Sequence, residues 1–247
     1  MSSISDPPHG PAVRLTPLNQ RHIDPPPTPT PSFSMADNEP DIATMIPKPH
    51  GKNGVTGPSF TNTPITQTQF LALLRSLQNQ TPFNALFLSH SGLSQHQLIQ
   101  LASQLEQTTQ IHHLILSRNT ISEFAAAAIR DLLKVNRYIG WLVLSQTELT
   151  DHELEIIADG LAKNSSIKHV VLDHNHISSQ GIHTFLKRIN GNKTIVSMIL
   201  HHNRIDDTGA QTIARMHRHF PALKTIDLTG NPISPHIKAK LKHPIKH

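Results

Sequence analysis

The sequence has 247 residues, enough for one or two domains, and its formal net charge is +5 with the histidines neutral. It contains no cysteine, which excludes disulfide bonds and thiolate metal sites and fits a reducing compartment. Only 4% of the residues are aromatic, so a folded core must be mainly aliphatic. Residues 160–247 carry thirteen basic and four acidic side chains. This basic last third either attracts acidic partners or simply keeps the surface soluble.

The first part of the chain differs in composition from the rest. Residues 1–60 hold thirteen of the nineteen prolines, including a run from Pro25 to Pro31, and show no hydrophobic period. Such a segment cannot bury enough apolar surface to offset the entropy of ordering, so we predict a disordered, Pro-rich leader over residues 1–64. The Pro25 run is either linker or a motif for an aromatic-lined groove. The sequence predicts no classical signal peptide and no transmembrane segment.

Regular structure is predicted to begin near Thr66. Thr66 and Gln69 have the spacing of a capping box, and Phe70, Leu73 and Leu77 follow on one helical face. These positions predict a cap helix over residues 65–82. Because the apolar positions lie 28 residues before those of the next helix, Leu98, Leu101 and Leu105, we assign this helix to an incomplete repeat that lacks its strand and caps the first repeat.

A 28-residue period of the form LxxLxLxxNxI dominates the remaining chain. The period begins at Phe83, Ile111, Ile139, Ile167, Ile195 and Leu223. Each unit combines a short alternating strand with a helix, and the helices are predicted to start after Ser94, Ser122, Thr150, Ser178 and Asp206. Self-similarity of this length is typical of a leucine-rich repeat. We predict an α/β fold, a right-handed solenoid of six repeats over residues 83–242, with a parallel sheet on the concave face and helices on the convex face.

Two resemblances to known proteins refine this prediction. The stretch from Ile139 to Phe220, with Gly181 and Gly209 near the starts of helices, resembles the ribonuclease-inhibitor-type leucine-rich repeat. That family implies the solenoid fold and the binding of diverse proteins. The Ile/Gln/Asn/His-rich composition and the Pro-rich leader also resemble, more weakly, leucine-rich repeat effectors that intracellular bacteria inject into host cells.

The last repeat is truncated. Ile237, Leu241 and Ile245 are spaced for one or two helical turns among several lysines. Residues 243–247 form a basic tail after these turns. The turns and the tail together are either a short C-terminal cap or an amphipathic element for a partner or an anionic lipid surface.

The strand positions that the core does not use are the candidates for binding. Five successive repeats place an apolar residue between the two core residues, namely Phe87, Ile115, Val143, Val171 and Ile199, with Trp141 beside the middle of this stripe. An apolar stripe with polar surroundings is a candidate docking surface. Alternatively, β-branched residues simply suit strands, or the leader or a second copy covers the stripe.

Histidines form a second candidate feature. His169, Asp173, His174, His176, His201 and His202 lie on adjacent repeats, with Arg204 close by. They are interpreted as plain polar surface, as a pH-responsive surface, or as ligands for Zn²⁺. With 19 histidines in the chain, neighbouring pairs also arise by chance, so the sequence alone assigns no metal ligand.

No catalytic motif is evident, since the sequence has no Gly-rich phosphate loop, no cysteine nucleophile and no HExxH. We therefore predict a monomeric, non-enzymatic protein-interaction module without a cofactor, cytoplasmic or secreted into a host cell. The alternatives are a GTPase-activating role through Arg118 or Arg204, or binding of anionic lipid or nucleic acid by the basic last third. Nucleic acid is less favoured because interleaved aromatic residues are missing. The predicted binding face comprises Phe87, Ile115, Trp141, Val143, His169, Val171, Asp173, His174, Ile199, His201 and His202.

Overall fold

The computed structural model describes residues 54–79, 82–241 and 245–246, which belong to one compact unit, Pro40–His247. The helices are α2 (Gln67–Gln78), α3 (Gln95–Glu106), α4 (Glu123–Val135), α5 (Asp151–Leu161), α6 (Ser179–Arg188), α7 (Asp207–Met216) and α8 (Pro235–Lys238), with a 3₁₀ turn η1 (His217–His219). The strands are β1 (Ala85–Phe87), β2 (His113–Ile115), β3 (Trp141–Val143), β4 (His169–Val171), β5 (Ser197–Ile199), β6 (Thr225–Asp227) and β7 (Ile245–Lys246).

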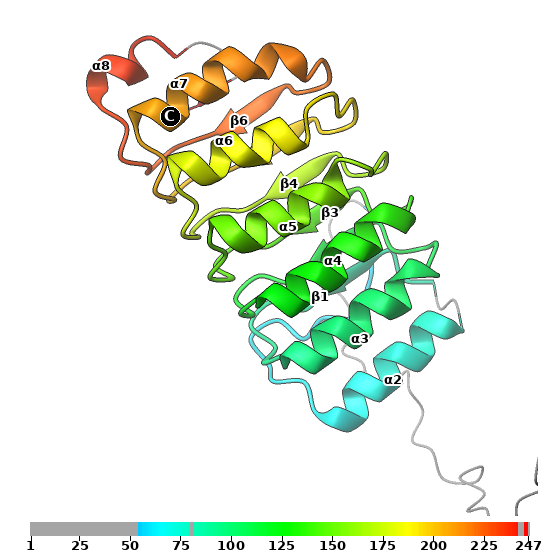
Figure 1. Cartoon of the computed structure of the whole chain (residues 1–247). Helices are drawn as coiled ribbons and strands as arrows, with labels where there is room; N and C mark the ends of the chain where they lie inside the picture. Colours follow the sequence, from blue (N-terminus) through cyan, green and yellow to red (C-terminus); the bar gives the residue numbers. More distant parts are fainter. Residues whose placement is uncertain (1–53, 80–81, 242–244, 247) are drawn as a thin grey trace, which may run out of the picture. The chain divides into compact units, whose positions relative to one another are not determined.

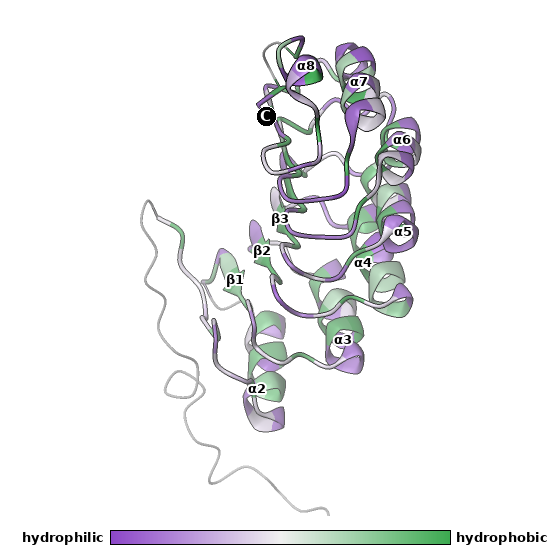
Figure 2. Ribbon diagram, turned by 90° about the vertical axis from the view of Figure 1, so that its left-hand side faces the viewer, coloured by the Kyte–Doolittle hydropathy of each residue, from purple (hydrophilic) through white to green (hydrophobic). Residues whose placement is uncertain are grey.

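The strands form one parallel sheet in chain order, β1 to β7, within the described residues. From β1 to β6 every residue lies opposite the residue 28 positions further along, as Ala85 lies opposite His113. The helices form a second layer along one face of this sheet (Figures 1 and 2). This arrangement confirms the predicted α/β leucine-rich repeat solenoid.

The core between the two layers is almost entirely aliphatic, as the composition predicts. Both inward strand positions of each repeat are buried, for example Leu142 and Leu144 in the third repeat. The facing helix contributes residues at helical spacing, such as Leu154, Ile157 and Leu161 in α5, each with no exposed surface. One repeat cannot cover this apolar face alone, so stacking of neighbouring repeats produces the continuous core.

The helix starts are satisfied by side chains as predicted. The Thr66 hydroxyl accepts a hydrogen bond from the Gln69 backbone, and the Gln69 side chain accepts one from the Thr66 backbone. The same reciprocal box occurs at Ser94 and Thr150, while Ser122, Ser178 and Asp206 cap their helices with one side-chain acceptor. None of the helices in the described segments has both the length and the apolarity needed to cross a membrane.

The N-terminal repeat is more complete than the sequence predicts. Residues 54–65 run beside β1: Phe60 N–H donates to the Phe87 carbonyl at 2.8 Å, and Ile65 N–H donates to the Ser91 carbonyl at 2.8 Å. Phe60 and Ile65 are buried, 28 residues before Leu88 and Leu93. The predicted incomplete repeat therefore does contain a segment beside β1, which forms an isolated bridge from Ser59 to Phe87 and no strand; residues 54–64 of the predicted leader belong to this segment. Pro58 stands where the later repeats carry the first inward residue of the strand, and this departure concealed the repeat. Residues 1–53 lie outside the described residues.

The C-terminal end also departs from the prediction. Helix α8 is a single turn, and Ile245 lies in β7 opposite Ile226 instead of on a helical face. The Leu228 N–H donates to the Lys246 carbonyl at 2.7 Å, and Lys246 Nζ lies 3.5 Å from the Asp227 carboxylate. The free hydrogen-bonding edge of β6 explains why this segment is extended. The remaining tail residues, 242–244 and 247, are not described.

Candidate functional site

The apolar stripe lies on the sheet face opposite the helix layer. Phe87, Ile115, Val143, Val171 and Ile199 occupy one register column across five adjacent strands, and each is partly exposed. The column ends at Asp227, the position opposite Ile199 on β6. The structure thus places the predicted stripe residues together. We use the name apolar stripe for these five side chains.

Trp141 lies in the register column next to the apolar stripe, and in that column its neighbours on both sides are histidines. Its indole ring stacks on His169 with a centroid distance of 3.7 Å and lies 5.8 Å from the ring of His113. Trp141 is 39% exposed, although it is held on both sides. Burial is the main cause that lowers the pKa of both histidines below 6.5, and electrostatic interactions lower it further, with His112 for His113 and with Lys168 for His169. Near neutral pH these rings are therefore uncharged and extend the apolar surface around the indole.

Three further histidine rings gather where β4 and β5 end. His174 and His202 stack in parallel with a centroid distance of 4.4 Å and an interplanar angle of 5°. His201 stands edge-on to both rings, at 5.0 Å from His174 and 5.2 Å from His202. One ring nitrogen from each histidine lies within 4.8 Å of the others. We call these three side chains the histidine cluster.

Asp173 does not have the exposed position that the sequence predicts. It is only 8% exposed, and its carboxylate accepts a hydrogen bond from Ser145 Oγ at 2.6 Å. Its second oxygen lies 2.9 Å from His174 Nδ1 and 3.8 Å from His201 Nε2. The carboxylate can be buried because Ser145 and His174 supply its hydrogen bonds. Asp173 is therefore nearly buried and contacts the surface histidines His174 and His201.

Three residues near this face were missed by the sequence reasoning. His113 completes the ring stack around Trp141, Ser145 holds Asp173, and Gly230 lies under His202. A Cβ at Gly230 would lie 2.7 Å from the His202 ring, so a side chain there would displace the imidazole. Their repeat positions are readable in the sequence, since each lies 28 residues from Trp141, Asp173 or His202. Their contacts depend on side-chain rotamers.

The two arginines considered for a GTPase-activating role lie apart on different repeats. Arg118 Nε donates to Gln146 Oε1 at 2.7 Å, and Arg204 Nη2 lies 3.0 Å from His176 Nδ1. Each guanidinium group thus contacts a side chain of a neighbouring repeat, and both arginines are exposed. His176 is thereby separate from the histidine cluster, although the sequence groups them.

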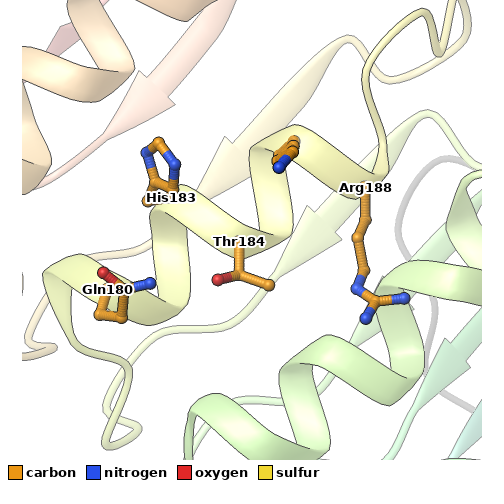
Figure 3. A pocket seen from close by; sticks show the side chains of 5 residues that line it. Gln180, His183, Thr184 and Arg188 are labelled. Carbon is orange, nitrogen blue, oxygen red and sulfur yellow. The ribbon is translucent and has the colours of Figure 1, made fainter.

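A hollow of about 460 Å³ occurs in the helix layer, on the opposite side from the stripe. Its walls come from a single helix, α6, and comprise Gln180, His183, Thr184, Lys187 and Arg188 (Figure 3). Arg188 pairs with Glu155 and Asp159 of α5. This hollow brings no set of reactive groups together, so the sheet face remains the stronger candidate site.

Two family models agree with this architecture. The chain matches the model of the PRAME C-terminal domain over residues 60–201 and a Leucine Rich repeat model over residues 191–214. No curated protein matches it. Among solved structures, leiomodin-1 actin-binding site 2 has 18% identity and a TM-score of 0.43, covering 70% of this chain and 81% of that chain. Internalin C2 from Listeria monocytogenes has 20% identity and a TM-score of 0.44, covering 76% and 77% respectively. Since the first model spans more than half of the sequence, the chain belongs to the PRAME C-terminal domain family of leucine-rich repeat proteins.

Proposed function

We propose that this protein is a non-enzymatic module that binds a protein partner through the exposed face of its sheet. The observation that supports this most strongly is the apolar stripe in register, with Trp141 exposed beside it and supported by two uncharged histidine rings. Apolar surface that remains accessible in this way is favourable to bury against a partner.

The size of the stripe suits a protein rather than a small molecule. Adjacent strands are about 4.8 Å apart, so five strands extend the stripe over roughly 20 Å. The inner strands are hydrogen-bonded to a neighbour on each side. For β2 and the residue after it, the Ile115 carbonyl accepts from the Leu88 N–H at 2.9 Å, and the Leu116 N–H donates to the Val143 carbonyl at 2.9 Å. Docking onto such a preformed surface loses little conformational entropy. We therefore propose rigid docking, with Trp141 as the anchor.

The surroundings of the stripe define the chemistry of the partner. On one side lie the rings of His113 and His169, and at the carboxyl ends of β4 and β5 lies the histidine cluster. A complementary partner would present an apolar centre with hydrogen-bond acceptors at its rim. The compositional resemblance to injected bacterial effectors makes a host-cell protein the first candidate.

The experiment is affinity capture from host-cell lysate with the full chain as bait, followed by a binding titration of the captured protein. The double variant Trp141→Ala with Val171→Asp removes the anchor and places a charge in the stripe. Truncating a binding hot spot costs about 2 kcal/mol or more, so Kd should rise roughly 30-fold or more.

The matched control is Phe124→Ala, which removes a side chain that is 72% exposed but lies in α4 of the helix layer. Binding should be unchanged in this control. If the double variant stays folded and binds as tightly as wild type, the proposed docking face is wrong. If Phe124→Ala alone abolishes binding, the partner docks on the helices.

We also infer that the repeats are of the ribonuclease-inhibitor type. Gly181 supports this inference, because a Cβ there would lie 2.0 Å from Oδ1 of Asp151, at the start of the preceding helix. That carboxylate accepts the Ser178 N–H at 2.8 Å, which ties the two helix starts together. Exchanging Gly181 for alanine should break this link, and a crystal structure of the variant would show whether the helix starts move apart.

A further inference from the structure

We propose that the histidine cluster, His174, His201 and His202, is a binding site for a divalent transition-metal ion of the zinc class. Imidazole nitrogen is a preferred ligand of Zn²⁺, Cu²⁺ and Ni²⁺, and three protein ligands with one open position form a common zinc site. These histidines lie at the rim of the proposed docking face, but the metal proposal rests on other observations.

The backbone brings the three residues together from two adjacent repeats. His174 and His202 occupy the same position of successive repeats, each in the left-handed conformation with φ of 54° and 53°. The His174 N–H donates to the His201 carbonyl at 3.0 Å, and the His202 N–H donates to the Thr229 carbonyl at 2.9 Å. These ladder bonds continue the parallel sheet, so the anchoring backbone is rigid and only the side chains must adjust to an ion.

The ring nitrogens already converge. Nδ1 of His201 lies 3.0 Å from Nδ1 of His202, which is the distance of a hydrogen bond between the two rings. Nitrogens bound to the same tetrahedral zinc ion lie about 3.4 Å apart, given a Zn–N bond of about 2.1 Å. In the cluster, the three nitrogens lie within 4.8 Å of one another. Rotation of the side chains, which are at least partly exposed, would shorten these distances to about 3.4 Å.

A buried carboxylate prepares one of the ligands. Asp173 Oδ2 lies 2.9 Å from His174 Nδ1, and the other carboxylate oxygen is held by Ser145 Oγ. In neutral His174 this contact places the proton on Nδ1 and leaves the lone pair of Nε2 for an ion. Such a carboxylate–histidine pair commonly orients metal-bound imidazoles. Asp173 is therefore assigned as a positioning residue and the three histidines as ligands.

The next repeat leaves room for the site. Gly230 follows His202 in the same repeat position, and it has no side chain to push against the imidazole. The other histidines on this face lack such convergence: His113 and His169 are separated by Trp141, and His90 Nδ1 contacts Asn62 Oδ1 at 3.3 Å. The described residues thus concentrate three imidazoles at a single point.

The test is calorimetric titration of the full chain, without a histidine tag, with Zn²⁺, together with visible absorption spectra of the Co²⁺-substituted protein. We expect one saturable equivalent of Zn²⁺ per chain and the intense d–d bands of low-coordinate Co²⁺. His174→Gln and His202→Gln should each weaken binding about tenfold or more and abolish those bands. Asp173→Asn should weaken binding about 10- to 100-fold and shift the bands, with the far-UV circular dichroism unchanged.

His113→Gln and His90→Gln are matched controls, because each removes an imidazole outside the cluster. Zinc binding in both should equal that of wild type. The proposal is overturned if no saturable binding occurs, or if several weak equivalents persist equally in His174→Gln, since the ions would then occupy other histidines. A variant that loses zinc but still captures the protein partner would separate this site from the docking proposal.

Discussion

At the residue scale, buried asparagines hold the repeats together through two ladders. In the first, Asn119, Asn175, Asn203 and Asn231 each donate a side-chain hydrogen bond to a carbonyl 31 residues earlier. Ser91 and Thr147 occupy the same position, and their hydroxyl groups donate to carbonyls of their own repeat, those of Leu88 and Leu144; Thr147 Oγ1 also lies 3.3 Å from Asn175 Oδ1 of the next repeat. The amide therefore reaches back to a carbonyl of the preceding repeat, which neither hydroxyl does.

A second ladder lies at the opposite end of the repeat, where the chain returns to the next strand. Asn136, Asn164 and Asn192 donate to the carbonyls of Leu105, Leu133 and Leu161. Their Oδ1 atoms accept backbone N–H groups that follow, such as that of Ile167 for Asn164. These asparagines therefore bind the preceding repeat through the donor and the chain that follows them through the acceptor.

The first prediction follows from the first ladder. Asn175→Ala would leave the N–H groups of Thr147 and Leu149 without their acceptor and would remove a donor to the Leu144 carbonyl. Because each buried unsatisfied group costs about 1–3 kcal/mol, we expect the free energy of unfolding to fall by about 3 kcal/mol. In Thr147→Ala, the Leu144 carbonyl keeps Asn175 as donor, so the loss should be about 1 kcal/mol. Urea denaturation of the two variants would contradict this account if Thr147→Ala were the more destabilised.

At the element scale, every repeat turns at a residue in the left-handed conformation just after its strand. The positions are Asn62, His90, Arg118, Gln146, His174, His202 and Gly230. Six of these seven are not glycine, although the left-handed conformation is uncommon for such residues. Asn62 completes the series for the segment that precedes β1, which supports its assignment as a repeat. Two cluster histidines occupy this turn position.

The second prediction concerns the N-terminal segment. Phe60 is fully buried, and the backbone around it bonds to β1. Phe60→Ala should lower the free energy of unfolding by about 3–5 kcal/mol, as expected for a large aromatic core side chain. Thr61→Ala, at an exposed neighbouring position, serves as control and should be nearly neutral. Equal stability of the Phe60 variant and wild type would show that residues 54–65 do not belong to the fold.

The third prediction concerns the cap of α7. The Asp206 carboxylate accepts the N–H groups of Thr208 and Gly209, and side-chain hydrogen bonds from Ser179 and Thr208 lower its pKa to about 2. Asp206→Ala should destabilise the protein by about 1 kcal/mol, the usual value for a lost N-cap. Asp206→Ser retains an acceptor and should lose only a few tenths of a kcal/mol. Thermal unfolding of both variants provides the measurement, and equal losses would argue against a capping role.

At the scale of the whole molecule, histidine burial links stability to pH. The pKa of His113 and of His169 lies below 6.5 in the folded protein, mainly because of burial. Below pH 6.5 the unfolded chain therefore binds more protons than the folded one, and the free energy of unfolding falls as the pH falls. This loss begins as the pH drops through the unfolded value and levels off below the folded value.

The fourth prediction isolates this effect. Urea denaturation at about pH 7.5 and about pH 5 should show a smaller loss of stability for the double variant His113→Gln with His169→Gln than for wild type. The pKa values of Asp131 and Asp206 are about 2, so the loss of their contributions starts below their ordinary value of 3.8. These two carboxylates therefore do not contribute to the change in stability between about pH 7.5 and about pH 5. If the free energy of unfolding fell equally in the double variant and in wild type, burial of His113 and His169 would not be the cause of the pH dependence.

The sequence by itself determined the repeat length, the strand columns and the helix starts of this protein. Those features depend on residue types at fixed spacings, as in the stripe from Phe87 to Ile199 and the caps from Ser94 to Asp206. Only the tertiary structure revealed the pairing of residues 54–65 with β1, the extension of the sheet by β7, and the burial of Asp173. It also brought His174, His201 and His202 into one cluster. The physical reason is that these features depend on two properties of the folded chain. Unpaired backbone groups at the edges of the sheet form hydrogen bonds with whichever segment lies beside them, and neighbouring repeats determine the side-chain rotamers. A pattern of residue types along the chain contains neither kind of information.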